Sequence, residues 1–186
     1  RRDAAGRGGR GMMRRLAALA LLLAPLPAAA DEAALRARPP EDEVIYFLLP
    51  DRFANGDALN DRGGLSGGSL VTGFDPARAG FYHGGDLKGL TGTCEPGDDG
   101  LTRIKSLGFT AVWLTPLVTQ QEAIGAGSGY HGYWGVYFLN VDPHLGTNAD
   151  MLEFSNCAKK LGLKIVLDVV TNHTGDVIKY LGNSPY

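Results

Sequence analysis

Residues 164–173 (Lys-Ile-Val-Leu-Asp-Val-Val-Thr-Asn-His) constrain the fold of this chain more than any other stretch. The run is apolar without the alternation of a half-exposed strand, which is typical of a strand buried on both faces in a parallel sheet. Polar side chains gather at its carboxyl end: Asp168, Thr171, Asn172 and His173. Ligands bind at that end of the strands in α/β barrels. The alternative interpretation is a core strand whose aspartate caps the next turn.

Two further apolar runs predict two more buried strands. They cover residues 44–49 and 109–114, and each ends at or just before a proline. Leucine and isoleucine recur at helical spacing over residues 101–107, which predicts a helix. A second helix is predicted over residues 149–161, with Asn148 as its N-terminal cap.

Strands and helices therefore alternate along the chain, which implies parallel strands joined by crossovers. Long loops at 51–99 and 120–137 follow strands, whereas short turns at Gly108 and Gly162 follow helices. This asymmetry is typical of a barrel whose active site is built from the loops after the strands. A doubly wound sheet would alternate similarly, but no Gly-rich phosphate loop follows the first strand. We predict an α/β fold, the first three βα units of an incomplete (β/α)8 TIM barrel. We expect the 51–99 loop to be ordered, because it keeps several aromatic and aliphatic residues.

The amino-terminal region has the pattern of a secretory signal peptide over residues 12–30. Arg14 and Arg15 precede an Ala/Leu run, and Ala28-Ala29-Ala30 supplies a cleavage site. The run is too short for a membrane-spanning helix. Residues 1–11 are interpreted as upstream sequence, and residues 31–43 as a polar linker. We therefore expect a secreted protein, extracellular or periplasmic, without a membrane anchor in the mature chain.

The charge of the chain bears on its binding partners, and its cysteine content bears on whether a disulfide can form. Removal of residues 1–30 takes away six arginines and one aspartate, which leaves 12 basic and 19 acidic residues and a net charge of −7. An acidic chain without basic clusters argues against nucleic acid as a partner. Export would permit a disulfide, and the chain has two cysteines, Cys94 and Cys157. The sequence does not show whether they pair.

The loop after the first predicted strand is rich in oxygen-bearing side chains. Asn55, Asp57, Asn60 and Asp61 lie within seven residues, and Asp86 follows in a His-Gly-Gly-Asp segment. Calcium binds six to eight oxygens from carboxylates, amides and carbonyls, so the loop is a candidate calcium site. The alternative is an Asn/Asp turn that satisfies its own backbone. The spacing is not that of an EF-hand.

A second candidate is an aromatic segment in the loop after the next strand. Tyr130, His131, Tyr133 and Trp134 lie together beside glycines. Aromatic faces stack on the apolar faces of sugar rings, and histidine can bond hydroxyl groups. The segment is thus a candidate sugar-binding site. The alternative is a small hydrophobic cluster under a long loop.

Several of these segments resemble the α-amylase family of glycoside hydrolases. Residues 168–173 resemble the first signature region of that family, at the end of the third barrel strand. Residues 51–57 resemble the segment after the first strand in bacterial α-amylases and cyclodextrin glucanotransferases. Three further segments, residues 83–90, 108–114 and 131–134, occur in the expected order between them. Together the five segments cover residues 44 to about 179.

The resemblance implies roles for individual residues. His131, Tyr133 and His173 would line the subsite of the cleaved glucose, with Tyr133 stacking on the sugar and the histidines bonding its hydroxyls. Asp168 would be the structural acid behind the catalytic centre. Asn172 would bind a calcium ion between the barrel and an inserted domain.

A second calcium site of the glucanotransferase branch is implied by six positions: Asn55, Asp57, Asn60, Asp61, Gly84 and Asp86. Two of these, Asp57 and Asp61, replace residues that are often amides. Residues 93–99 do not fit the compact pattern expected before the first helix.

The resemblance also implies that this chain contains no catalytic carboxylate. A retaining glycosidase needs two carboxylates, and in this family they follow later barrel strands, beyond Tyr186. Glu122 matches no motif of the family, and Glu153 lies on a predicted helix, so neither replaces them. Residues 44–173 would form the amino-terminal part of the barrel, and residues 174–186 the start of the inserted domain. Three strands of eight would leave open edges, so we expect the isolated chain to be unstable and inactive.

These observations predict part of a secreted, calcium-dependent α-amylase-like enzyme that acts on α-1,4-glucans such as starch by a retaining mechanism. One alternative is a transglycosylase of the same family, such as a cyclodextrin glucanotransferase. Two others are a non-catalytic glucan-binding relative and an inactive truncated product.

Overall fold

The computed structural model describes residues 32–125 and 127–177. The expected signal peptide at 12–30, the upstream residues 1–11 and residues 178–186 of the expected start of the inserted domain lie outside these residues. Within the described part, no helix has the length and apolar character needed to cross a membrane.

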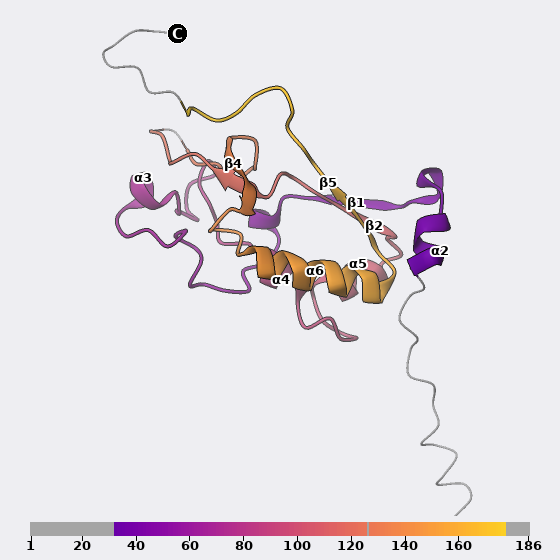
Figure 1. Ribbon diagram of the computed structural model, residues 1–186. Coiled ribbons are helices and arrows are strands. Elements are labelled where there is room, and N and C mark those ends of the chain that lie inside the picture. Colours follow the sequence, from indigo (N-terminus) through magenta and orange to yellow (C-terminus); the bar gives the residue numbers. More distant parts are fainter. Residues whose placement is uncertain (1–31, 126, 178–186) are drawn as a thin grey trace, which may run out of the picture.

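Three short parallel strands form the centre of the fold (Figure 1). They are β1 (Ile45–Leu48), β2 (Ala111–Leu114) and β5 (Lys164–Leu167), in the order β1-β2-β5. The three expected strands and their parallel arrangement are confirmed. Each strand is shorter than its apolar run, so the polar residues from Asp168 onward follow β5 rather than extend it.

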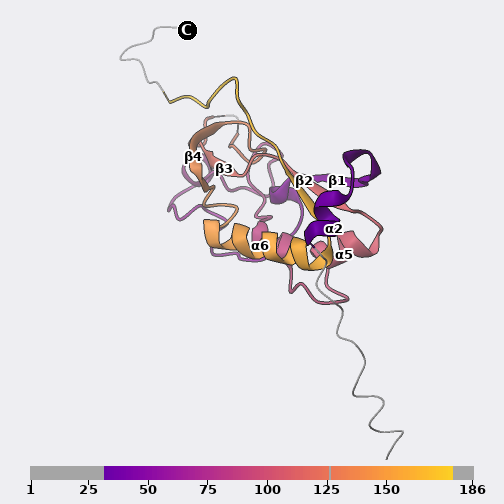
Figure 2. The ribbon, with the colours of Figure 1, turned by 45° about the vertical axis from the view of Figure 1, so that its right-hand side comes forward.

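Helices cover one face of this sheet (Figures 1 and 2). They are α4 (Leu87–Thr91), α5 (Leu101–Ser106) and α6 (Asn148–Leu161). The buried side chains of α6 are Phe154, Cys157 and Ala158, which repeat at the three- and four-residue spacing of one helix face. They pack with side chains of α4, α5 and the strands into one hydrophobic core. The expected order of strands and helices is therefore confirmed.

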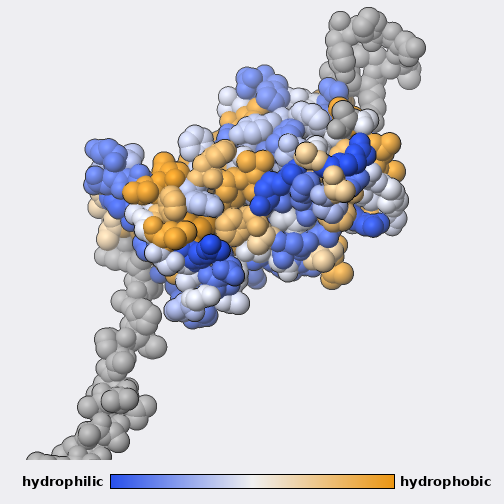
Figure 3. Space-filling model, turned by 180° about the vertical axis from the view of Figure 1, so that it is seen from behind, coloured by the Kyte–Doolittle hydropathy of each residue, from blue (hydrophilic) through white to orange (hydrophobic). Residues whose placement is uncertain are grey.

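The opposite face of the sheet is open in the described part of the chain. Phe47, Trp113 and Val166 stand beside one another in register across the three strands, and between 36% and 53% of their surface is exposed. Apolar side chains also gather on the face seen in Figure 3. The prediction that the third strand is buried on both faces is wrong for these residues, because the helices cover only one face.

An antiparallel hairpin, which the sequence did not predict, flanks the loop predicted over 120–137. It consists of β3 (Val118–Gln120) and β4 (Gly135–Val141), whose pairing has two register irregularities. Pattern analysis missed it because β3 has three residues and the connection is rich in glycine. The cap of α6 also differs from the prediction. Thr147 caps the helix in a reciprocal capping box with Asp150, whereas the side chain of Asn148 accepts a hydrogen bond from the amide of Val141.

The long 51–99 loop is ordered, as expected. It contains the turn η3 (Pro50–Arg52), helix α3 (Ser69–Thr72) and helix α4. Phe81 and Tyr82 are 1% and 2% exposed, so the loop carries its own buried aromatic side chains.

Residues 31–43, interpreted as a linker, contain helix α2 (Glu32–Ala37) and the turn η2 (Pro40–Asp42). The segment leads to Glu43, whose carboxylate lies at the amino ends of the strands. It bonds the side chains of Arg38 at 2.7 Å, Lys164 at 2.8 Å and Thr110 at 2.7 Å. One buried carboxylate therefore joins the segment before β1 to the starts of β2 and β5.

The two cysteines, left unassigned by the sequence, form a disulfide. Cys94 lies in the connection between α4 and α5, and Cys157 lies on the buried face of α6. Lys160, one turn further along α6, pairs with Glu95 at 2.9 Å. The disulfide thus ties to α6 the segment 93–99, which did not fit the family pattern.

Candidate active site

The carboxylate of Asp168 and the hydroxyl of Tyr133 meet at the carboxyl ends of the strands. The Tyr133 hydroxyl donates a hydrogen bond of 2.7 Å to Asp168 Oδ2. Asp168 directly follows β5, and its amide bonds to the carbonyl of Leu114 at the end of β2. Burial raises the pKa of Tyr133, and the neighbouring Asp168 raises it further. The phenol therefore remains a hydrogen-bond donor at neutral pH.

His131 packs against Tyr133 from within the same loop. The backbone amide of Tyr133 donates to His131 Nδ1 at 3.0 Å, and the two rings stack at 5.9 Å with an interplanar angle of 20°. The rings of Trp134 and His131 are nearly perpendicular, with their centres 4.8 Å apart. Burial lowers the pKa of His131, which favours the neutral ring. Because Nδ1 accepts a bond, the proton of the neutral ring lies on Nε2.

Gly132 allows this loop to approach the end of β2. Its φ angle is +89°, and a side-chain carbon there would lie 2.2 Å from the carbonyl oxygen of Pro116. Larger residues would therefore displace the loop. Gln120, which is buried, accepts a bond of 2.7 Å from the amide of Trp134. Sequence analysis did not single out Gln120, because an isolated glutamine carries no pattern.

His173 reaches the same loop from the segment after β5. Its Nε2 lies 2.9 Å from the carbonyl oxygen of Tyr133. The structure therefore brings together all five predicted residues of the sugar site: His131, Tyr133, Trp134, Asp168 and His173. Asn172 is exposed beside them. An open depression of about 530 Å³ is lined by Phe138 and residues 170–174.

The candidate calcium loop is organised around Asp86, which is fully buried. One carboxylate oxygen accepts bonds from the amides of Gly56 and Gly89, and the other from the amide of Asp57 and the side chain of Asn60. Asp86 thereby caps α4 and closes the loop upon itself. The Asn/Asp turn that we considered as the alternative is present at Asp57, whose Oδ1 accepts a bond from the amide of Leu59.

The remaining candidate ligands lie close by. The side-chain amide of Asn55 bonds Asp61 at 2.7 Å, and a side chain at Gly84 would lie 2.7 Å from both. Asn60 Oδ1 is buried and has no hydrogen-bond partner. Burial raises the pKa of Asp61, and the charges of Asp86 and Asp57 add to this effect.

Two observations limit this grouping. The carboxylate of Asp57 pairs with Lys88 at 2.6 Å. Within residues 32–125 and 127–177, no three His, Cys, Asp or Glu side chains are placed to hold a metal ion. Any ion there would need the mixed set of amide, carboxylate and backbone oxygens.

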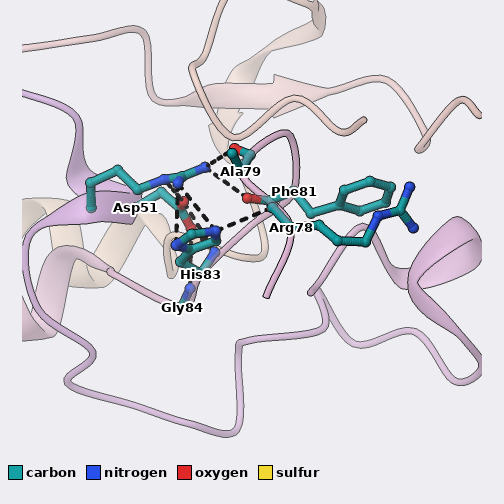
Figure 4. Close-up of polar contacts among 7 residues, drawn as sticks. Asp51, Arg78, Ala79, Phe81, His83 and Gly84 are labelled. Atoms are coloured by element: carbon teal, nitrogen blue, oxygen red, sulfur yellow. Dashed lines mark hydrogen bonds and ion pairs between the residues drawn. The ribbon is translucent and has the colours of Figure 1, made fainter. Parts of the chain in front are cut away.

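A second polar cluster includes Asp51, Ala79, Phe81 and His83 (Figure 4), and Arg52 contacts each of them. Its guanidinium bonds Asp51 at 2.8 Å, the ring of His83 at 3.2 Å and the carbonyls of Ala79 and Phe81. Asp51 is 2% exposed and accepts bonds from two amides of residues 83 and 84. Burial raises the pKa of Asp51, although these bonds and Arg52 oppose the effect.

Comparison with known proteins identifies the family. Residues 47–185 match the family described as "Alpha amylase, catalytic domain". An α-amylase of Streptomyces lividans is 40% identical over 90% of this chain and 20% of its own length. A cyclomaltodextrin glucanotransferase of Klebsiella oxytoca is 38% identical over 71% of this chain and 19% of its own length.

A solved structure agrees with these sequence matches. The crystal structure of an Anoxybacillus α-amylase superposes with a TM-score of 0.61 at 40% identity, covering 74% of this chain and 26% of that protein. The chain thus spans about a fifth to a quarter of the length of these relatives. Its strands β1, β2 and β5, with the helices that follow β1 and β2, are the first units of a (β/α)8 barrel. The chain belongs to the α-amylase family of glycoside hydrolases.

Proposed function

We propose that this chain is the amino-terminal part of a secreted α-amylase that hydrolyses α-1,4-glucans with retention of anomeric configuration. The observation that carries the proposal is the convergence of Tyr133, His131, His173 and Asp168 where β2 and β5 end. Ligand sites of (β/α)8 enzymes lie at this end of the strands.

The geometry supports a specific role for each residue. The Tyr133 ring would stack on a glucose unit, because its hydroxyl is already committed to Asp168. The neutral His131 would donate from Nε2 to a sugar hydroxyl, since Nδ1 is occupied. The exposed His173, whose Nε2 contacts the carbonyl of Tyr133, would bond a second hydroxyl. Asp168 would hold the Tyr133 ring rather than act on the bond that is cleaved.

The chemical step would be carried out by carboxylates in later strands of the longer protein. In a retaining glycosidase one carboxylate attacks the anomeric carbon while the other protonates the leaving oxygen, and water then hydrolyses the glycosyl-enzyme. The residues of the present chain would bind and orient the sugar for that step. Their contribution is positioning.

A transglycosylase is the second candidate, because a cyclomaltodextrin glucanotransferase is among the similar proteins. Product analysis separates the two functions. The full-length protein incubated with soluble starch should release linear maltooligosaccharides if it is a hydrolase. Cyclic products would support the transferase, and an unchanged polymer would contradict both.

Export is supported by two independent features. The signal-peptide pattern at residues 12–30 would direct the chain out of the cytoplasm. The disulfide between Cys94 and Cys157 would be maintained in an oxidising compartment.

Calcium is proposed as a structural ion in the loop around Asp86. The unpartnered, buried Asn60 Oδ1 and the clustered charge at Asp61 fit a hard cation, with Asn55 and the carbonyl of Gly84 completing the oxygens. Asp57 would join only if it left Lys88. Asn172 is proposed for the second ion. A bound ion would crosslink the loop after β1 to the segment before α4.

Removal of calcium from the full-length protein is expected to lower its melting temperature. When the free ion concentration is a hundred times the dissociation constant, an ion that binds only the native state stabilises it by about 2.7 kcal/mol. Calorimetry with and without a chelator measures the effect. Calcium added back should restore the melting temperature, whereas magnesium, which prefers strict octahedral sites, should not. A melting temperature indifferent to chelation would contradict both proposed sites.

Replacing Tyr133 with phenylalanine is expected to reduce kcat/KM for starch. The substitution keeps the stacking ring but removes the hydrogen bond to Asp168. Bonds to charged acceptors contribute about 1.5–3 kcal/mol, which corresponds to a loss of roughly 10- to 150-fold. Tyr137→Phe, at a half-exposed tyrosine of β4, is the matched control. Equal activity of the two variants would show that the Tyr133–Asp168 bond does not position the sugar site.

A further inference from the structure

The guanidinium of Arg52 contacts the sugar-binding loop as well as its own cluster. Its central carbon lies 4.1 Å from the centre of the Tyr130 ring. Tyr130 is half-buried, and its ring forms a T-shaped contact with the neighbouring His131 ring, with the ring centres 5.1 Å apart. A chain of contacts therefore runs from Arg52 through Tyr130 to His131 and Tyr133.

The edge of the Arg52 guanidinium is fully engaged. All three nitrogens contact acceptors that come from the end of β1 and from residues 79–83. Its side chain is 28% exposed, so the cation is partly withdrawn from water. A planar group fixed along its edge offers a face of defined position, and the Tyr130 ring lies over that face.

The cluster around Arg52 is anchored in the core of the fold. Asp51, which orients the guanidinium, is buried and bonds the amides of His83 and Gly84. Contacts with the carboxyl end of β1 thus fix the position of Tyr130, although Tyr130 lies in the connection between β3 and β4. This is a contact between two loops that follow different barrel strands.

We propose that Arg52 is a positioning residue for the sugar-binding loop. Its guanidinium holds the Tyr130 ring and thereby sets the positions of His131 and Tyr133 for an α-glucan. The inference rests on the proposed function for its substrate, but the contact itself is independent of activity. Arg52, which follows β1, thereby affects substrate binding through the ring of Tyr130.

Hydrogen exchange in the full-length protein tests the contact without reference to activity. Arg52→Gln removes the charge and the planar fork, and exchange of amides 130–134 should accelerate about tenfold, as expected for loss of a partly buried cation–π contact. Exchange within β2 and α6 should be unchanged. Arg78→Gln is the matched control, because Arg78 also lies over a ring, that of Phe81 at 3.9 Å, but outside the sugar-binding loop.

A double-mutant cycle on KM tests the role in binding. Arg52→Gln should raise KM for maltoheptaose about tenfold and leave kcat within about twofold. In a Tyr130→Leu background the same substitution should have no further effect, because the ring through which it acts is gone. Equal rises in KM in both backgrounds, or uniform acceleration of exchange throughout the protein, would overturn the proposal.

Loss of Arg52 leaves the buried Asp51 without its cation. A second pair of variants therefore keeps Arg52 and changes only the side chain of Tyr130. With Arg52 intact, Tyr130→Phe keeps a ring beside the guanidinium and should raise KM and amide exchange much less than Tyr130→Leu does. Identical behaviour of the two variants would overturn the proposal. A wild-type protein that does not act on any α-glucan would refute the proposed function, and the exchange data would still decide the role of Arg52.

Discussion

Loss of the Cys94–Cys157 disulfide is expected to destabilise the protein by about 4 kcal/mol, the value of the chain-entropy model for a loop of this length. The bond joins residues 63 apart, and it crosslinks the connection between α4 and α5 to the buried face of α6. Without it, the unfolded chain gains freedom and the 93–99 segment loses its anchor to the core. The paired substitutions are Cys94→Ser at the loop and Cys157→Ala at the buried position.

Urea unfolding of the full-length protein measures this effect. The wild-type midpoint should fall in the presence of dithiothreitol toward that of the double variant, which should itself be insensitive to the reductant. The control is therefore internal to the experiment. Equal midpoints for the wild type and the double variant under oxidising conditions would show that the disulfide contributes nothing to stability.

Glu43 is expected to make the stability of the protein depend on pH in the acid range. Its pKa is lowered from 4.5 to about 2, chiefly by the hydrogen bond from Arg38 and further by Lys164 and Thr110, although burial opposes the shift. The folded state thus binds this proton more weakly than the unfolded state. The stabilisation is complete above pH 4.5 and is lost as the pH falls through 4.5 toward 2.

The expected size of the Glu43 effect is about 3 kcal/mol at neutral pH, because each pKa unit corresponds to about 1.4 kcal/mol. Glu43→Gln should remove most of it and flatten the pH dependence between 4.5 and 2. Glu41→Gln, at an exposed glutamate in the same segment, is the matched control. Denaturation at a series of pH values measures all three proteins. Parallel pH profiles for the wild type and Glu43→Gln would contradict the assignment.

Strands and helices were predictable where the sequence carries a repeating pattern. Continuous apolar runs predicted β1, β2 and β5, and helical spacing predicted α5 and α6. The resemblance to the α-amylase family, rather than a local pattern, predicted that Asp168, His173 and the aromatic loop surround one subsite. In the structure the Tyr133 hydroxyl bonds Asp168.

Features that depend on single contacts were not predictable. The hairpin of β3 and β4 is held by short, irregular pairing, and its glycines resemble those of a loop. Cys94 and Cys157 gave no sign of pairing, because their separation in space depends on how α4, α5 and α6 pack. Arg52 and Gln120 act through specific geometry with residues far along the chain. No local pattern in the sequence reports such contacts.

Burial of the third strand shows how an inference from composition can fail in a particular chain. The apolar run after Lys164 predicted a strand covered on both sides, yet Val166, on the face away from the helices, is 36% exposed, and Leu167, on the other face, is 52% exposed. An apolar composition indicates that a strand can be buried on both faces. Whether that environment is present depends on the segments that pack against it.

The most direct test of the proposed enzyme is the stereochemistry of its first product. Proton NMR of the full-length protein acting on a maltooligosaccharide follows the anomer released before mutarotation. A retaining α-glucan hydrolase releases the α-anomer first, which is the result we predict. Initial release of the β-anomer, or no cleavage by a folded protein, would contradict the assignment of this chain to a retaining α-amylase.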